Sequence, residues 1–298
     1  MVNKNTGKRE GKRMAIGEVI WTYFKGEWHE GNLPIMGAAD HGTWLGSLVF
    51  DGARSFEGVV PDLDLHSARV NASAEVMGLK PTLTTQQLIE LTLEGLKKFD
   101  KDAAVYIRPM YWSTEGGAGT VVPDADSTAF CLCLEQFPMA PTTYTQTLCR
   151  TSFVRPMVSM APVNAKAACL YPNNGRMIRE AQARGYNNAL VADALGNVAE
   201  TGTANIFMVK DEVIYTPIPN GTFLNGITRQ RVIGLLREAG CEVIETTLSF
   251  EDFEGADEVF MSGNISKITP VVKFEDVEYP IGPVSKLARD LYWKWAKS

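Results

Sequence analysis

Two segments in the first half of the chain restrict its fold most strongly. Residues 104–111 (AVYIRPMY) and 129–134 (AFCLCL) are rich in β-branched, aromatic and other apolar side chains, a composition typical of sheet strands. The glycine-rich stretch 116–119 lies between them. Cys131 and Cys133 are two residues apart, so both side chains should point to the same face of their strand.

Helices are predicted upstream of these strands. Residues 63–77 show helical spacing, and Leu65, Ala68, Ala72 and Val76 fall near the face that this spacing assigns to the core. Residues 84–99 form a second candidate, because a threonine and a glutamine three residues apart at its start make a capping box. A short hairpin is expected over residues 18–28.

Strands alternate with helices in the second half. The pattern predicts strands at 189–192, 206–209, 213–216, 243–246 and 258–261, and helices at 229–239 and 284–295. The prolines and threonines of residues 137–150 suggest a linker. We therefore expect an α/β protein with a flexible basic arm (1–14), a smaller N-terminal domain (15–140), an interdomain linker (141–157) and a larger C-terminal domain (158–298).

Composition excludes several classes of protein. The chain has 298 residues, a net charge of −6 and 45% hydrophobic residues, so it lacks the basic character expected of a nucleic-acid partner. No run of apolar residues is long enough to span a membrane, and no signal peptide is apparent. The five cysteines and three histidines indicate neither a disulfide framework nor a metal site, and we place the protein in a reducing cytoplasm.

Lys166 is the candidate for chemistry. It lies in VNAKAACLYPNNGR, between Val163 and Arg176, among small and apolar residues. Burial among such residues lowers the pKa of a lysine, and a neutral amine can attack a carbonyl to form a Schiff base. The sequence Asn173-Asn174-Gly175 that follows is a turn signal. A surface lysine whose stem lies over a helix is the alternative.

Several blocks of sequence around Lys166 resemble one enzyme family. They are, in chain order, FDGARSF through ARVNASAEVMGL, NAKAACLY, LVADALGNVAETGTANIFMVKDEVIYTP, NGITRQRVIGLLREAG and VFMSGNISKITPV. Their order and spacing resemble the class IV aminotransferases, the fold type IV enzymes that use pyridoxal 5'-phosphate (PLP). The resemblance covers roughly residues 35 to 280, and the branched-chain amino acid aminotransferases are its closest branch.

The resemblance implies a two-domain fold with the cofactor between the domains, and it assigns roles to individual residues. Lys166 would form the Schiff base and transfer the proton, and Glu200 would face the pyridine nitrogen. The residues implied to bind the cofactor are Arg69, Lys166, Tyr171, Glu200, Ile227, Thr228 and Asn264.

The resemblance also implies substrate-binding residues, which are Arg54, Tyr106, Arg108, Asn264 and Ile265. Tyr106 and Arg108 match a YxR element that holds the substrate and its distal carboxylate. Leu45, Asp51 and Asn264 depart from the branched-chain pattern, so the side-chain preference is open.

These features predict a PLP-dependent aminotransferase. The expected reaction is ping-pong amino transfer from a branched-chain L-amino acid to 2-oxoglutarate, in a homodimer or higher homo-oligomer whose partners are small molecules. An R-selective amine or a D-amino acid transaminase is the alternative on the same fold. A non-catalytic binding protein is the alternative of a different class.

Overall fold

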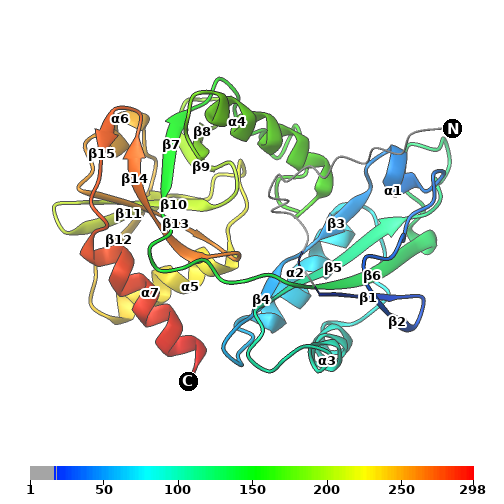
Figure 1. Cartoon of the computed structure of the whole chain (residues 1–298). Coiled ribbons are helices and arrows are strands. Elements are labelled where there is room, and N and C mark those ends of the chain that lie inside the picture. Colours follow the sequence, from blue (N-terminus) through cyan, green and yellow to red (C-terminus); the bar gives the residue numbers. More distant parts are fainter. Residues whose placement is uncertain (1–16, 18) are drawn as a thin grey trace, which may run out of the picture.

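The computed structural model describes residues 17 and 19–298, so the arm predicted for residues 1–14 lies outside the described residues. The described chain forms two sheets, one in each half of the sequence, and the two halves lie side by side (Figure 1). The α/β class predicted from the sequence is confirmed.

The first sheet contains six strands, and all of its pairs are antiparallel. Its strands are β1 (Ile20–Phe24), β2 (Glu27–Glu30), β3 (Leu48–Phe50), β4 (Ala53–Ser55), β5 (Val105–Ser113) and β6 (Thr128–Gln136). The two strands predicted first are β5 and β6, which pair along their whole length. Cys131 and Cys133 are both buried on β6, and neither forms a disulfide bond.

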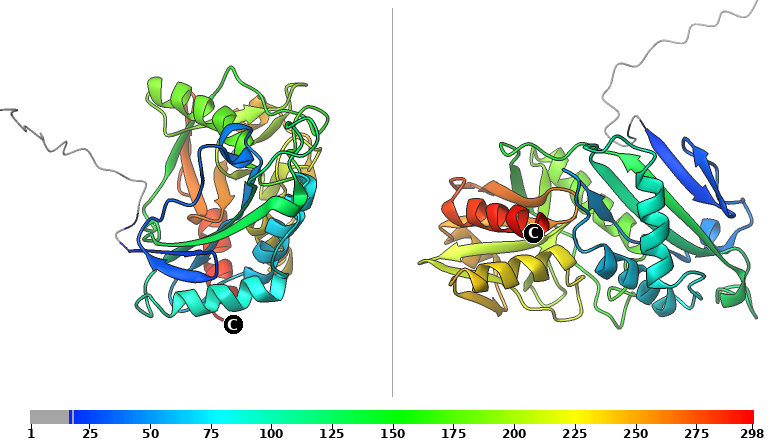
Figure 2. Two further views of the ribbon diagram at one scale, coloured as in Figure 1. Left: turned by 90° about the vertical axis from the view of Figure 1, so that its right-hand side faces the viewer. Right: turned by 90° about the horizontal axis from the view of Figure 1, so that it is seen from below.

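Helices α2 (Leu63–Val76) and α3 (Thr85–Leu96) pack against this sheet (Figure 2), and α1 (His41–Trp44) and the 3-10 turn η1 (Ala125–Ser127) lie at its edge. The capping box at Thr84 and Gln87 is confirmed. The predicted inner face of α2 is wrong, because Leu65 and Val76 are exposed, whereas Val70 and Ala74 are buried. The predicted and observed buried faces of α2 differ because the observed face contains serines and His66, which are polar and are therefore not recognised as core residues from the sequence.

The second sheet contains nine strands in the order β12-β11-β10-β13-β14-β7-β8-β9, and β15 pairs with β14. Its strands are β7 (Gln146–Arg150), β8 (Asn188–Ala192), β9 (Val198–Thr201), β10 (Asn205–Lys210), β11 (Val213–Pro217), β12 (Val243–Thr246), β13 (Glu258–Gly263), β14 (Lys267–Phe274) and β15 (Val277–Glu278). The sheet curls, so that β9 also contacts β10. Part of the predicted linker is therefore sheet, because β7 pairs with both β14 and β8.

Four helices cover the second sheet: α4 (Tyr171–Ala183), α5 (Ile227–Glu238), α6 (Phe250–Glu254) and α7 (Pro283–Ala296). The turn predicted at Asn173-Asn174-Gly175 is wrong, because these residues lie in the first turns of α4. Pro172 near the start of α4 has its φ already set for a helix. Helix α4 packs on Ala189 and Val191, and α5 and α7 pack on Phe207 and Phe260. The residues that alternate with these along the strands point into a separate apolar cluster that includes Phe253 of α6, so α4, α5 and α7 lie on the same face of the curled sheet.

Side chains from both halves share contacts. Phe56, in the loop after β4, packs into the apolar cluster formed by α5, α7 and the second sheet. Arg231 on α5 binds Asp62, which precedes α2, at 2.6 Å. Within residues 17 and 19–298, no helix has the length and apolar character to cross a membrane.

Candidate active site

A cavity of about 600 Å³ lies between the two halves and is lined by residues of both. Nine of the predicted site residues line it: Arg69, Tyr106, Lys166, Tyr171, Glu200, Ile227, Thr228, Asn264 and Ile265. Another hollow, of about 660 Å³, is lined by residues of the first half and contains none of the predicted site residues. The first cavity is therefore the candidate active site.

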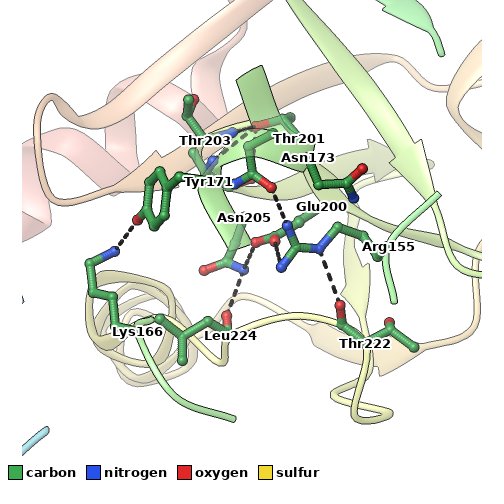
Figure 3. A network of polar contacts seen from close by, with 12 residues as sticks. Arg155, Lys166, Tyr171, Asn173, Glu200, Thr201, Thr203, Asn205, Thr222 and Leu224 are labelled. Carbon is green, nitrogen blue, oxygen red and sulfur yellow. Dashed lines mark hydrogen bonds and ion pairs between the residues drawn. The ribbon is translucent and has the colours of Figure 1, made fainter. Parts of the chain in front are cut away.

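Lys166 is held by the first half although its side chain points into the cavity. Its N–H donates to Ser73 Oγ on α2 at 3.1 Å, and its carbonyl oxygen accepts from the N–H of Phe50 at 3.1 Å. Nζ donates to the hydroxyl of Tyr171 at 2.8 Å (Figure 3). Burial, together with the charge of Arg69, lowers the pKa of Lys166, so its amine is easier to deprotonate than that of a surface lysine.

Glu200 on β9 provides a buried carboxyl group in the same cavity. Burial raises its pKa to about 7, while Arg155 and Lys166 oppose that rise. Arg155 lies 3.2 Å from Glu200 Oε1, and Asn205 Nδ2 lies 3.3 Å from Oε2 (Figure 3). The carboxyl group can therefore exist in either charge state near neutral pH, and a positive group close to it favours the ionised state.

Arg155 was missed by the sequence analysis. It is 4% exposed, lines the cavity and is fixed by hydrogen bonds to the carbonyl oxygen of Thr222 at 3.2 Å and to Asn174 Oδ1 at 2.6 Å. It lies in the segment predicted as a linker, and no local pattern marks it. Its importance follows only from its distance to Glu200.

One end of the cavity is built to receive an anion. Helix α5 begins there at Ile227, and its N-cap, Gly226, makes no side-chain capping hydrogen bond. The first N–H groups of a helix have no partner within it, so they can bind an anion. Ser262 and Asn264 line the same cavity, and Ser262 Oγ and Asn264 Nδ2 are buried without a hydrogen-bond partner among the described residues. A phosphate or carboxylate would satisfy these donors.

Arg69 brings positive charge to the cavity and is held by a buried carboxylate. Its Nε and Nη2 donate to the two oxygens of Asp51 at 2.6 and 2.8 Å, and His66 Nδ1 lies 2.7 Å from Asp51 Oδ1. Burial alone would raise the pKa of Asp51, but Arg69 and His66 outweigh it and lower that pKa. Asp51 therefore positions Arg69, a role that the sequence analysis did not assign.

Two predicted substrate-binding residues do not line the cavity. Arg54 is fully buried and donates to the carbonyl oxygen of Phe137 at 2.6 Å. Arg108 donates to Glu135 Oε2 at 2.6 Å, on the strand next to its own. Both arginines are neutralised or hydrogen-bonded inside the first half and do not line the cavity. Each nevertheless lies next to Tyr106: Arg54 is its register partner in the sheet, and the Arg108 guanidinium lies 5.1 Å from the centre of its ring.

The residues present fit a phosphorylated pyridine aldehyde. The anion-binding end, the amine of Lys166 and the carboxyl group of Glu200 line one cavity, and these are the groups that such a cofactor needs for its phosphate, its aldehyde and its ring nitrogen. The buried donors without partners at Ser262 and Asn264 support this fit.

Comparison with known proteins agrees with the geometry. The family model for amino-transferase class IV matches residues 48–274. The branched-chain-amino-acid aminotransferase of Escherichia coli (strain K12) is 31% identical over 94% of each chain. An aminotransferase from Brucella abortus bound to PLP has 61% identity and a TM-score of 0.93, over 94% of this chain and 100% of that one. The branched-chain aminotransferase from the thermophilic archaeon Thermoproteus uzoniensis with norvaline has 26% identity and a TM-score of 0.85, over 94% of this chain and 95% of that one.

The chain therefore belongs to the class IV aminotransferases, with the fold type IV architecture that its sequence predicted. It is a PLP-dependent aminotransferase. Both predictions made from the ordered sequence blocks are confirmed.

Proposed function

We propose that this enzyme transfers the amino group of a branched-chain L-amino acid to 2-oxoglutarate by a ping-pong mechanism. The observation that carries the proposal is the position of Lys166, whose amine shares one cavity with Glu200 and with the anion-binding end at α5. The lowered pKa of Lys166 suits an amine that acts first as a nucleophile and then as a base.

The roles of the side chains follow from their positions. When bound, PLP supplies an aldehyde for the amino group and a ring that accepts the electrons of the broken C–H bond. Lys166 Nζ would hold the cofactor and would move the proton from the substrate α-carbon to C4′ of the cofactor, as a base and then as an acid. Ionised Glu200, supported by Arg155, would favour a protonated ring nitrogen. The N-terminus of α5 and Arg69 would bind the phosphate.

The donor is proposed from two supports. Relatives such as the Escherichia coli protein are branched-chain-amino-acid aminotransferases. The cavity also presents apolar side chains at Phe50, Val163, Leu170 and Met261, beside Tyr106, which suits an aliphatic substrate. Leu45 and Asp51 depart from the branched-chain pattern. An R-amine or a D-amino acid therefore remains the alternative donor.

The acceptor is proposed from a branched-chain amino acid aminotransferase of similar fold that is complexed with N-(5'-phosphopyridoxyl)-L-glutamate. Arg108 is the predicted partner of the distal carboxylate, and one of its nitrogens is engaged by Glu135. For Arg108 to serve 2-oxoglutarate, its guanidinium would have to reorient toward the cavity. Replacing Arg108 by Met should then raise the KM for 2-oxoglutarate and leave the rate with L-leucine in the first half-reaction unchanged.

The first test is a half-reaction screen of the purified, yellow enzyme. L-leucine, D-alanine, and an R- and an S-arylalkylamine are added separately, and loss of the yellow absorbance is followed. Bleaching by L-leucine alone is expected. Bleaching by D-alanine or the R-amine alone would overturn the branched-chain proposal. Lys166→Met should remain folded and fail to bleach with any donor; a colourless wild type that takes up no PLP would instead support the non-catalytic alternative.

We also propose that the enzyme is a homodimer. Trp44 and Leu45 at the end of α1 are exposed in the single chain, and a Cβ at the next residue, Gly46, would lie 3.7 Å from Cys169, which is three residues after Lys166. Neighbouring exposed apolar side chains are typical of surfaces that another chain covers. The cytoplasmic location inferred from the cysteines stays a prediction.

A further inference from the structure

Lys267 occupies an unusual position beneath the turn that carries Asn264. It begins β14, is 1% exposed and has a φ of +61°, in the left-handed region that residues other than glycine rarely adopt. Its register partner across the β13–β14 hairpin is Gly263. Such a conformation persists only where the surrounding contacts hold it. The contacts of the buried side chain of Lys267 should therefore explain its position.

An ion pair does not provide that explanation. Among the described residues, Lys267 forms no ion pair within 4.0 Å. Asp62, the nearby carboxylate, is already bound to Arg231 at 2.6 Å. Arg54 adds a second positive charge close to Lys267. Burying an ammonium group without a carboxylate is costly, and a methionine would fill the same volume without that cost.

The direct partner of Lys267 is Asn264. Lys267 Nζ donates to Asn264 Oδ1 at 2.6 Å. Because an ammonium group has only donors, the carbonyl oxygen of the amide must face it, and Nδ2 must then face the opposite way. Asn264 lines the cavity, and its Nδ2 is buried and has no hydrogen-bond partner among the described residues.

We propose that Lys267 is a positioning residue, which orients the side-chain amide of Asn264 so that its N–H donor faces an oxyanion in the cavity. The oxyanion is the α-carboxylate of the substrate or the phosphate of the cofactor, and both present the same acceptor chemistry to Nδ2. Without Lys267, the amide could turn and present its oxygen, which repels an anion. If the oxyanion is the α-carboxylate, the inference rests on the proposed function, which supplies an amino acid substrate. If it is the phosphate, the inference does not depend on the proposed donor.

The charge state of Lys267 makes the orientation sensitive to pH. Burial, together with the charge of Arg54, lowers the pKa of Lys267 to about 7, while Asp62 opposes this. Above that pH the neutral amine can accept as well as donate, so the preference of the amide weakens. The other titratable groups near it are Tyr292 on α7 and His66 on α2. Oxyanion affinity should fall as the pH rises from about 6 to 8.

The test measures oxyanion binding and not turnover. The probes are 4-methylvalerate, a carboxylate without an amino group, titrated into the holoenzyme, and PLP titrated into the apoenzyme, both by calorimetry. The variants are Lys267→Met, Lys267→Glu, Asn264→Ala and the double variant Lys267→Met with Asn264→Ala. Lys273→Met, on the same strand but outside the cavity lining, is the matched control.

Lys267→Met should weaken binding of one probe about tenfold, because a hydrogen bond to a charged group is lost. Lys267→Glu should weaken it further, since a carboxylate would draw Nδ2 away from the cavity. In the Asn264→Ala background, Lys267→Met should change the affinity less than about twofold, whereas a purely structural effect would be the same in both backgrounds. The pH dependence should also be smaller in Lys267→Met.

The two probes distinguish the source of the oxyanion. Weaker 4-methylvalerate binding identifies the carboxylate, and weaker PLP binding identifies the phosphate. Equal effects of Lys267→Met with and without Asn264, or no effect on either probe, would overturn the inference. A wild type that does not bleach with L-leucine would contradict the proposed donor, yet the PLP titration would still test the role of Lys267.

Discussion

Glu200 is buried where it would face the cofactor. This burial makes ionisation of its carboxyl group unfavourable in free energy. Its pKa is raised to about 7, against an ordinary value near 4.3. In the apoenzyme, the folded state therefore holds a proton that the unfolded state has lost between these pH values. The free energy of unfolding should fall across that range and then level off above pH 7.

Replacing Glu200 by Gln should remove the destabilisation that a buried ionised carboxylate causes in the folded state. At pH 8 the apoenzyme variant should be more stable than the wild type by up to about 3 kcal/mol, and the difference should vanish toward pH 4.5. Urea unfolding at both pH values measures it. Equal stability of the two proteins at pH 8 would contradict a raised pKa of Glu200. Amino transfer by the variant should still be strongly reduced, because the carboxylate is lost.

Arg155 should set the pH at which Glu200 works. Since its positive charge lowers the pKa of Glu200, Arg155→Met should raise that pKa. The acid limb of the kcat/KM profile should then move upward by about one pH unit or more. Arg176→Met is the matched control, because Arg176 is an exposed arginine that is bound to Asn173 and lies outside the cavity lining. An unchanged acid limb in Arg155→Met would assign that limb to another group.

At the scale of the element, helix α5 depends on glycine at its N-cap. A Cβ at Gly226 would overlap Asn205 Oδ1, and Asn205 connects Glu200 to the carbonyl oxygen of Leu224. The close approach of these two residues keeps the first N–H groups of α5 open to the cavity.

Gly226→Ala should therefore raise the Kd for PLP about tenfold or more, because Asn205 must move and the anion site with it. Gly234→Ala, within the same helix, is the control. A Cβ there meets nothing within 4 Å, so it should leave the Kd unchanged and stabilise the protein by about 0.5–1 kcal/mol. PLP titration of both apoenzymes and their unfolding curves test this. Equal Kd values for the two variants would contradict the anion-binding role of the α5 N-terminus.

Several single strands and helices could be predicted from the pattern of residues within each of them. The β5 and β6 segments, the α3 capping box and the strands β10 and β11 each depend on side chains a few positions apart, and each was predicted. The inner face of α2 was not, because the polar side chains of His66, Ser67 and Ser73 occupy it. Their burial is decided by partners such as Asp51 and Lys166, which lie far away in the sequence.

At the scale of the whole molecule, the proposed dimer can be tested by its surface. His41 Nε2 lies 3.1 Å from the carbonyl oxygen of Val121, so α1 lies beside a loop in which Val121 and Val122 are 71% and 62% exposed. Trp44 on α1 is also exposed, at 60%, and we propose that a second copy of the chain covers these three apolar side chains.

Trp44→Lys combined with Val122→Lys should convert the dimer into a monomer, as measured by light scattering, because two charges would be buried on association. Leu195→Lys, in the turn between β8 and β9, is the control, since Leu195 is 78% exposed but belongs to the other half. It should remain dimeric. A double variant that stays dimeric would show that the contact between subunits lies elsewhere. A monomeric wild type would contradict the proposed dimer.

The sequence by itself determined the class of fold and most strands and helices, because these follow from side chains close together along the chain. The candidate residues of the site came from the ordered blocks that resemble the family, and their roles stay predictions. Only the tertiary structure decided how those residues meet. It holds the backbone of Lys166 against β3 and α2 of the other half. It also places Arg155 beside Glu200, and Arg54 and Arg108 inside the first half. Such contacts join residues tens of positions apart, and their geometry depends on how whole sheets and helices pack, which no local pattern specifies.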